Sequence, residues 1–405
     1  MILKTAFAIL FLVAAAAPSS AADAAFARWL ESLWPRAQTL GVSRATFEAV
    51  TRGLEPDLKL PDLVIAGRPD AQPGGQAEFI QVPSDYLREV SLARLADQGR
   101  KLAADHRVTL RAIEQRFGVP PEVVLAIWGR ETAYGAHKLA HNAIRVLATQ
   151  AYTGRRKEMF TQEFLLALKL VQERHVKLDD MRSSWAGAMG QTQFLPSEFY
   201  KHAVDFDGDG RRDIWNSVPD TLASAAQQLS AKGWQRGQGW AYEVRAPQGM
   251  DCTIANPDFT LTLSEWLRRG YALSHNRKLA QAELDQRASL LQPAGLYGPS
   301  FLILRNYYVI KEYNFSDLYV LFVGHLSDRI AGGPAFEARW ETIAQLNPLQ
   351  LEKMQTVLTA RGLYADKIDG KAGMKTRLAL GAYQKAHAMK VDCWPSKPVL
   401  DHMQR

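Results

Sequence analysis

The sequence predicts a mainly helical protein with a small β element and a separate three-helix unit at its C-terminal end. Apolar residues recur with helical periodicity from residue 26 to 175, whereas strand-like runs are short and come late. A Gly- and Pro-containing break at 331–334 precedes an independent helical pattern. With 405 residues, of which 47% are hydrophobic and 22% charged, the chain has the composition of a folded globular protein.

The first 22 residues are typical of a secretory signal peptide. Lys4 precedes an apolar run, and small residues follow it up to Ala21 and Ala22. The run is too short for a comfortable transmembrane helix, and no later run of about 18 apolar residues exists. We therefore expect an exported protein without a transmembrane segment. Because no cysteine stands near the cleavage site, we expect no lipid anchor there.

The helices of the main domain are predicted by their start and stop signals. An apolar pattern over residues 85–117 ends at Gly118, a natural residue just after a helix C-terminus. Pro120 and Pro121 then begin the next helix, because proline fits the first helical turn. Residues 157–175 repeat the helical pattern with apolar side chains on one face.

The β element and the domain boundaries are predicted by the later part of the chain. Short aromatic and aliphatic runs, each bounded by Gly, Pro or Asn, predict strands at 259–262, 301–304 and 307–310. Since a single core stops growing near about 250–300 residues, we expect one large and one small domain. The predicted organisation is a signal peptide at 1–22, a main domain at 23–330, a linker at 331–348 and a three-helix unit at 349–405.

Charge and cysteine content narrow the classes of partner. The net charge of +7 favours an anionic partner, but the basic residues are scattered and form no run with interleaved aromatics, so we expect no nucleic acid. Cys252 and Cys393 are the two cysteines of the sequence, and neither has the spacing of a zinc site. Whether they pair or remain buried thiols is open at this point.

Glu131 is the first candidate for chemistry. It lies at helical spacing on the same face as three apolar residues, Val124, Ile127 and Trp128. A carboxylate there either swings out at the helix end to pair with Arg130 or Lys138, or is buried so that its pKa rises, as a general acid requires. Gly129 and Gly135 favour the second reading, because glycine permits a close approach of backbone or ligand.

A second candidate is the small-residue segment 183–196. Its glycines and alanines alternate with Ser184, Gln191 and Gln193, which together predict a wall where polar groups closely approach a ligand. The alternative is a tight turn before a helix that begins at Pro196. That alternative explains the glycines and leaves the glutamines unexplained.

A third candidate is the acidic loop 205–216, which matches much of a calcium-binding loop. Asn216 stands where such loops carry a bidentate Glu, so we expect weak binding of Ca²⁺. Four carboxylates within nine residues repel one another unless a cation binds. The predicted ligands are Asp205, Asp207, Asp209, the backbone carbonyl of Arg211, and Asp213.

A fourth candidate is the segment 306–314, which groups Tyr308 and Tyr313 with Asn314. Sugars stack on aromatic rings and take hydrogen bonds at the rim of a cleft. Ordinary core packing is the alternative for these tyrosines.

Together the four segments resemble the membrane-bound lytic transglycosylase B family, whose members cleave the glycan strands of peptidoglycan. The matching stretches are Gly-Arg-Glu-Thr-Ala-Tyr-Gly, Ser-Trp-Ala-Gly-Ala-Met-Gly-Gln-Thr-Gln-Phe-Leu-Pro, Asp-Phe-Asp-Gly-Asp-Gly-Arg-Arg-Asp-Ile-Trp-Asn and Glu-Tyr-Asn. The tail is similar to the type 1 peptidoglycan-binding domain. It matches through Leu351, Met354, Gln355, Leu358, Gly362, Tyr364, Asp369, Gly370, Gly373, Thr376, Tyr383 and Gln384.

The resemblance implies a goose-type lysozyme-like fold and a lytic transglycosylase that forms 1,6-anhydro-N-acetylmuramic acid ends. Glu131 would be the general acid and then the base, and the muramic O6 hydroxyl would attack in place of water. No cofactor is then required for the chemistry, and Ca²⁺ would be structural. The residues implied near the substrate are Ser184, Gln193, Tyr313 and Asn314, with Tyr134 and Gln191 as weaker candidates.

The resemblance also implies a location and partners. We expect a monomeric periplasmic enzyme that binds glycan strands of peptidoglycan and works with complexes of cell-wall synthesis or division. Two alternatives remain at this point: a lysozyme-type hydrolase that uses Glu131 with water, and a catalytically silent peptidoglycan-binding protein.

Overall fold

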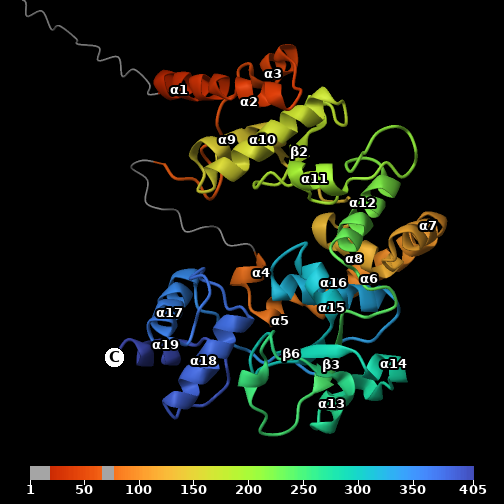
Figure 1. The fold of residues 1–405 in the computed structure, drawn as a ribbon, viewed down its shortest axis with the longest axis vertical. Coiled ribbons are helices and arrows are strands. Elements are labelled where there is room, and N and C mark those ends of the chain that lie inside the picture. Colours follow the sequence, from red (N-terminus) through yellow and green to blue (C-terminus); the bar gives the residue numbers. More distant parts are fainter. Residues whose placement is uncertain (1–18, 66–76) are drawn as a thin grey trace, which may run out of the picture.

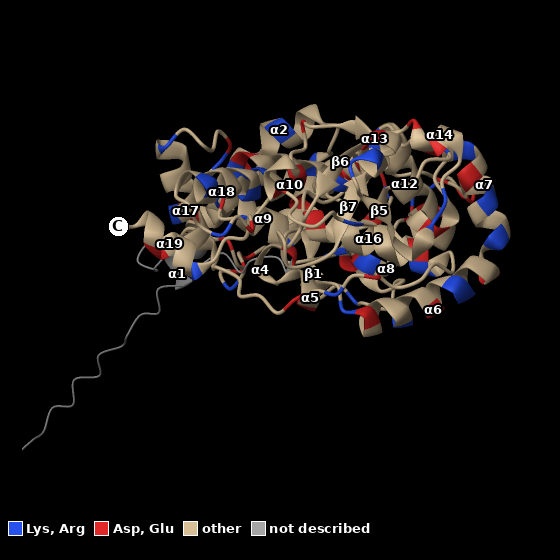
Figure 2. Cartoon of the chain, turned by 90° about the horizontal axis from the view of Figure 1, so that it is seen from below, with Lys and Arg blue, Asp and Glu red and all other residues tan. Residues whose placement is uncertain are grey.

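The computed structural model describes residues 19–65 and 77–405, and Figure 1 shows their arrangement. Residues 1–18 of the predicted signal peptide lie outside the described residues. Within the described ranges, no helix is both long enough and apolar enough to cross a bilayer. Lys, Arg, Asp and Glu are interspersed over the elements (Figure 2), which agrees with the scattered charge of the sequence.

The described chain is mainly helical, as predicted. The α-helices are α1 (Ser19–Ser32), α2 (Trp34–Thr39), α3 (Arg44–Thr51), α4 (Ala77–Ile80), α5 (Pro83–Tyr86), α6 (Glu89–Asp105), α7 (Arg107–Phe117), α8 (Pro121–Thr132), α9 (Ala143–Thr153), α10 (Lys157–Gln172), α11 (Pro196–His202), α12 (Val218–Ala231), α13 (Leu263–Arg268), α14 (Gln281–Leu284), α15 (Arg305–Lys311), α16 (Asp317–Ile330), α17 (Pro348–Ala360), α18 (Met374–Ala386) and α19 (Lys397–Met403). Short 3₁₀ turns lie at Leu178–Asp180, Cys252–Ile254 and Ser274–Asn276.

The predicted helix over residues 85–117 is divided in the structure. Its sequence forms the end of α5 and the whole of α6 and α7, with a break at His106. Gly118 follows α7 with a φ of 77°, the left-handed conformation that makes glycine favourable after a helix. Pro121 occupies the first turn of α8, as predicted.

Two helical groups surround separate apolar cores. In one, α1–α3 pack around α9 and α10, and Figure 1 shows this group at one end of the long axis. In the other, α16 packs against α8 and α6, with α7 and α12 on the flanks. The second group contains the helix that carries Glu131, so this core fixes the position of that residue.

The strands form a two-stranded and a five-stranded antiparallel sheet. The larger sheet has the order β4-β6-β7-β3-β5. Helix α13 packs against this sheet, and together they form a separate apolar core. Tyr242 of β3 and Leu290 of β6 both pair with Leu302 of β7. The strands are β1 (His141–Asn142), β2 (Arg182–Ser183), β3 (Ala241–Arg245), β4 (Leu261–Thr262), β5 (Ala272–Leu273), β6 (Arg287–Leu291) and β7 (Ser300–Ile303).

The strand predictions were partly wrong. Residues 259–262 and 301–304 contain β4 and most of β7, but residues 307–310 lie in helix α15. Tyr307, Val309 and Ile310 are all buried there, although their composition favours a strand. Burial on several sides of a short helix overrides that local preference. Strands β3 and β6 were not predicted from the sequence.

The C-terminal helices α17–α19 share an apolar core that includes Leu351, Leu358 and Tyr383. Residues 331–347 form no helix or strand, yet Phe336 and Trp340 pack against the main core. Cys252 and Cys393 form a disulfide bond across 141 residues, which decides the question that the sequence left open. The tail is therefore covalently tied to the sheet region.

We expect the double variant Cys252→Ser/Cys393→Ser to lose about 2–5 kcal/mol of unfolding free energy, because the long closed loop restricts the unfolded chain. Denaturant unfolding of both proteins, with and without a reductant, measures the loss. The reductant should lower the midpoint of the parent protein and leave that of the double variant unchanged. Equal midpoints for the two oxidised proteins would contradict the expectation.

Candidate functional site

Glu131 lies on the last turn of α8, inside the main helical core. The three predicted face partners of this residue, Val124, Ile127 and Trp128, are buried as expected. Glu131 itself is partly exposed, so it borders on solvent although protein surrounds it. The residues after α8 turn sharply, with left-handed φ values at Ala133, Tyr134 and Gly135. Helix α8 thus ends one residue after Glu131, at Thr132.

The environment of Glu131 raises the pKa of its carboxyl group. Burial raises the pKa of Glu131 to about 7, while the hydrogen bond from Tyr319 and the charge of Arg130 oppose that rise. The Tyr319 hydroxyl donates to Glu131 Oε1 at 2.5 Å. Glu131 forms no ion pair with Arg130 or Lys138, whose side chains are both within the described residues. The structure therefore favours a buried carboxyl group over a side chain that swings out to pair with Arg130 or Lys138.

Arg130 forms its hydrogen bonds and ion pair with residues other than Glu131. Its guanidinium donates to the Tyr86 hydroxyl at 2.9 and 2.6 Å and lies 3.8 Å from Glu78 Oε2. Glu78, from α4, is buried, accepts a hydrogen bond from Asn314 at 2.8 Å, and also raises the pKa of Glu131. The structure thus places a second carboxylate in this neighbourhood, from a segment that the sequence analysis did not consider.

The small-residue segment braces α8. Trp128 Nε1 donates to Gln191 Oε1, and Gln191 Nε2 donates to the Trp215 carbonyl, both at 2.8 Å. Gly135 has a φ of 78°, which favours glycine, and a Cβ atom there would lie 2.4 Å from Gln191 Oε1, so a larger residue would displace this amide. Gln191 therefore links the helix of Glu131 to the acidic loop that contains Trp215.

Tyr134 and Gln191, the two weaker substrate candidates, have partners inside the protein. The side chain of Tyr134 is buried against Gly129, and its hydroxyl donates to the Leu95 carbonyl at 2.8 Å. The amide atoms of Gln191 are engaged by Trp128 and Trp215, as described above. Both residues also support α8, since Tyr134 packs against Gly129 and Gln191 accepts a hydrogen bond from Trp128, and their role toward a substrate stays a prediction.

The other predicted substrate residues are partly exposed: Ser184, Gln193, Tyr313 and Asn314. The Tyr313 hydroxyl donates to the Thr192 carbonyl at 2.7 Å, beside Gln193. The Tyr313 ring stacks on Tyr319, with 6.3 Å between ring centroids and 12° between planes. Tyr319 also donates a hydrogen bond to Glu131. These contacts therefore place Glu131 in the same region as Gln193, Tyr313 and Asn314.

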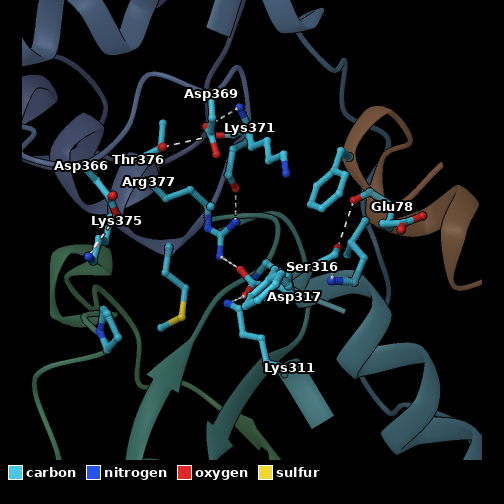
Figure 3. A pocket seen from close by; sticks show the side chains of 18 of the residues that line it. Glu78, Lys311, Ser316, Asp317, Asp366, Asp369, Lys371, Lys375, Thr376 and Arg377 are labelled. Atoms are coloured by element: carbon cyan, nitrogen blue, oxygen red, sulfur yellow. Dashed lines mark hydrogen bonds and ion pairs between the residues drawn. The ribbon is translucent and has the colours of Figure 1, made fainter. Parts of the chain in front are cut away.

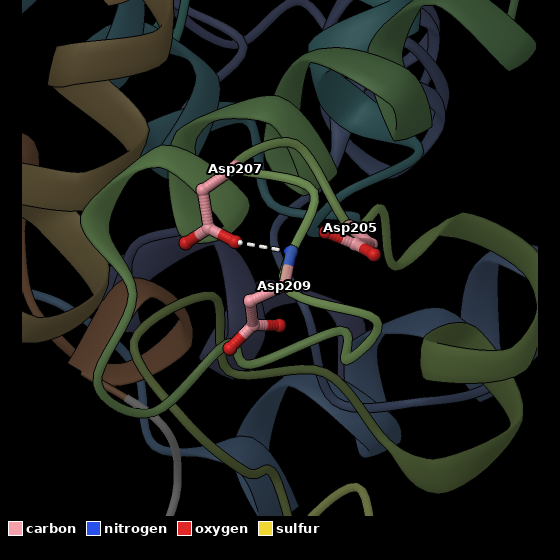
Figure 4. Close-up of side chains that lie close together, drawn as sticks. All are labelled: Asp205, Asp207 and Asp209. Carbon is pink, nitrogen blue, oxygen red and sulfur yellow. Dashed lines mark hydrogen bonds between the residues drawn. The ribbon is translucent and has the colours of Figure 1, made fainter.

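The acidic loop brings together three of its predicted ligands. One oxygen each of Asp205, Asp207 and Asp209 lies within 4.8 Å of the others, as Figure 4 illustrates. The Asp213 carboxylate instead accepts hydrogen bonds from Trp215, at 2.9 Å, and from Asn216. Three carboxylates in a small space suit a hard cation such as Ca²⁺. The side chain of Arg211 pairs with Asp209 at 2.9 Å.

Several residues of the site were missed by the sequence analysis. Tyr319 lies 188 residues from Glu131, and no local motif identifies it. Asp220 of α12 is fully buried and accepts the backbone N–H groups of Phe206 and Asp213 at 2.7 and 2.8 Å, so it anchors the acidic loop. No local pattern marks Asp220, because its burial appears only in the fold.

Comparison with known proteins finds similarity to transglycosylases. The family described as Transglycosylase SLT domain matches residues 25–328. Membrane-bound lytic murein transglycosylase B of Escherichia coli strain K12 is 32% identical over 227 residues, which are 54% of this chain. The match spans 58% of that curated relative, little more than half of its length.

Solved structures extend the similarity to the tail. SltB3 from Pseudomonas aeruginosa, in complex with NAG-anhNAM-pentapeptide, is 36% identical with a TM-score of 0.81 and covers 94% of this chain and 99% of its own. The same protein was also solved with NAG-NAM-pentapeptide. Slt35 from Escherichia coli, in complex with calcium, is 27% identical with a TM-score of 0.52 and covers 62% of this chain and 77% of its own.

Proposed function

The chain belongs to the Transglycosylase SLT domain family, and from that premise we propose that it is a lytic transglycosylase of peptidoglycan. It cleaves the bond between N-acetylmuramic acid and N-acetylglucosamine and leaves 1,6-anhydro-N-acetylmuramic acid ends. The observation that carries the proposal is Glu131, whose pKa burial raises to about 7 at the end of α8. The anhNAM ligand of SltB3, a protein similar over almost the whole chain, supports the proposed product.

The chemistry uses one carboxyl group twice. Glu131, protonated, donates its proton to the glycosidic oxygen as the bond to the muramic C1 breaks. The resulting carboxylate then accepts the proton of the muramic O6 hydroxyl as O6 bonds to C1. No water is consumed, and Glu131 ends protonated. Tyr319 orients the carboxyl group throughout, because its hydroxyl donates to Oε1.

The partly exposed residues around Glu131 supply the substrate side of the site. We assign this role to Ser184, Gln193, Tyr313 and Asn314. Stacking on Tyr319 fixes the position of the Tyr313 ring. Glu78 and the Ser316 backbone N–H orient the Asn314 amide. Gln191 and Tyr134 act behind them, through the packing of α8.

Product mass tests the proposal. Mature protein incubated with purified peptidoglycan should release muropeptides lighter by one water than hydrolysis products. Reducing ends would instead indicate a lysozyme-type hydrolase, for which Glu78 is the candidate second carboxylate, since it is near enough to affect the pKa of Glu131. An absence of products would leave a peptidoglycan-binding protein.

Replacing Tyr319 with phenylalanine should move the alkaline limb of the pH profile to higher pH. The acid form of Glu131 is the active one, so activity falls as pH rises through about 7. The Tyr319 hydroxyl stabilises the ionised form, and its loss raises the pKa of Glu131 further. Initial rates of strand cleavage between pH 5 and 9, about two units either side of that value, measure the shift.

The control for this variant is Tyr200→Phe, because the Tyr200 hydroxyl donates to Glu173 rather than to Glu131. Its pH profile should match that of the parent protein. A limb that moves to lower pH in Tyr319→Phe would contradict the assigned role of the hydrogen bond.

The chain is also proposed to act outside the cytoplasm, in the periplasm, after removal of the signal peptide. The Cys252–Cys393 disulfide supports an oxidising compartment. We propose residues 23–330 as the catalytic domain and 349–405 as a peptidoglycan-binding domain joined by 331–348. A monomer that works with complexes of cell-wall synthesis or division completes the proposal.

Titration of the chelator-treated protein with Ca²⁺ should give a saturable heat, because three loop carboxylates lie close enough to share one cation. The structure of Slt35 with calcium supports the same expectation for this chain. Asp207→Ala should abolish the heat, whereas Asp97→Ala on the distant helix α6 should preserve it. A parent protein without a calcium heat would rule out the site.

A further inference from the structure

We propose that the pocket between the start of α16 and the C-terminal helices binds the terminal carboxylate of the peptide carried by the muramic acid, an inference that rests on the proposed function. The pocket has a volume of about 380 Å³. Its walls come from α4 and the residues after it, the α15–α16 region and residues 364–377 (Figure 3). Both the main domain and the tail thus contribute to it.

The pocket offers apolar surface to a ligand. Phe79, Pro257, Tyr308 and Met374 line it, together with Phe315. Phe315 is 72% exposed, an unusual position for a large apolar side chain, and it follows the predicted substrate residue Asn314. Apolar walls with a few polar groups are typical of sites that bind small organic groups.

The acidic groups of the pocket are already paired. Asp317 accepts from the Tyr307 hydroxyl at 2.7 Å and forms ion pairs with Lys311 and, at 2.9 Å, with Arg377. The other pairs join Asp366 to Lys375, Asp369 to the Gln355 amide and the Lys371 backbone N–H, and Glu78 to Asn314 and Arg130. A cationic ligand would therefore have to break existing ion pairs or hydrogen bonds.

Two lysines, Lys367 and Lys371, line the pocket without an ion pair among the described residues; Lys367 is exposed, and the half-buried one is Lys371. Its ammonium lies 3.7 Å from the centroid of the Phe79 ring and forms no ion pair within the described ranges of the chain. Figure 3 shows its side chain extending into the space between the tail and α16. An unpaired, half-buried ammonium beside apolar walls suits a carboxylate attached to an apolar group.

The pocket adjoins the segment that carries Tyr319. Ser316, Asp317 and Leu318 line it, and the next residue, Tyr319, bonds Glu131. A pentapeptide spans up to about 17 Å when extended. In the proposed binding mode, the stem of a muramic acid bound near Glu131 extends past the start of α16 toward Lys371. The pocket would bind the end of the peptide while the residues near Glu131 bind the sugar.

The test compares two synthetic disaccharide-pentapeptides that differ only at the peptide end, one with a free carboxylate and one with a carboxamide. Affinities are measured by calorimetry on the full chain carrying Glu131→Gln, so that no ligand is consumed. We expect the carboxylate form to bind about tenfold tighter. Lys371→Gln should abolish this preference, and Lys353→Gln, an equal loss of charge on the exposed side of α17, should retain it.

Equal affinities for the two ligands, or an unchanged preference in Lys371→Gln, would overturn the inference. A thermal melt of each variant verifies that the tail remains folded. Failure of the proposed function has a different signature, because the parent protein would then release no anhydro products from peptidoglycan, whatever the binding results. A disaccharide without peptide shows whether the lactyl carboxylate alone is recognised; tighter binding of it than of the carboxylate-ended pentapeptide would also contradict the assignment.

Discussion

Glu131→Gln should lower the rate of strand cleavage by at least about 10²–10⁴-fold, the usual contribution of a general acid. Glutamine has nearly the same shape as glutamate, so binding should change little, but it has no acidic proton to donate to the leaving oxygen. The same carboxylate also removes the O6 proton in the second step, which places the expected loss at the upper end of the range. Rates of muropeptide release measure the effect.

Glu122→Gln is the matched control, because Glu122 is in the first turn of the same helix, more than two turns from Glu131. It should keep nearly full activity and lose only a little helix stability. A Glu131→Gln protein that retains most of its activity, with a normal thermal melt, would remove Glu131 from the mechanism.

Arg377→Met should cost about 3–5 kcal/mol of unfolding free energy, because it leaves a buried carboxylate with one cation fewer. Arg377 and Asp317 are both buried, and their charged atoms lie 2.9 Å apart across the boundary between tail and main domain. Burial alone would raise the pKa of Asp317, but Lys311 and Arg377 lower it below its usual value. Denaturant unfolding near neutral pH measures the loss.

The pH dependence of this stability has a definite sign. Because the folded state lowers the pKa of Asp317, its contribution is present above about pH 4, the usual pKa of the group, and is lost as the pH falls. The double variant Arg377→Met/Asp317→Asn should recover part of the loss. Arg361→Met, an exposed arginine of the same unit, should cost far less, and an equal cost would contradict the ion-pair account.

Local patterns in the sequence were enough to predict the helix of Glu131. The i, i+3, i+4, i+7 spacing correctly placed this residue with Val124, Ile127 and Trp128, because helical periodicity depends only on neighbouring residues. The acidic loop could be predicted for the same reason, since Asp205, Asp207 and Asp209 lie within five residues of one another. Local motifs were therefore enough to predict where the two candidate centres lie in the sequence.

Contacts between distant segments could not be predicted in this way. The hydroxyl that bonds Glu131 comes from Tyr319, and the neighbouring carboxylate comes from Glu78, beyond any local pattern. The hydrogen bonds of Gln191 to Trp128 and Trp215 were likewise hidden, because these residues become its neighbours only in the fold. The same limit explains the strand predicted at 307–310, where burial decided for a helix.

The most direct test of the central claim is digestion of purified peptidoglycan in ¹⁸O-labelled water, with the parent protein and Glu131→Gln side by side. If Glu131 delivers its proton and O6 closes the ring, the parent protein releases anhydro ends that contain no ¹⁸O, and the variant releases almost nothing. Ends that carry ¹⁸O from the solvent would show that water is the nucleophile and would contradict the proposed reaction.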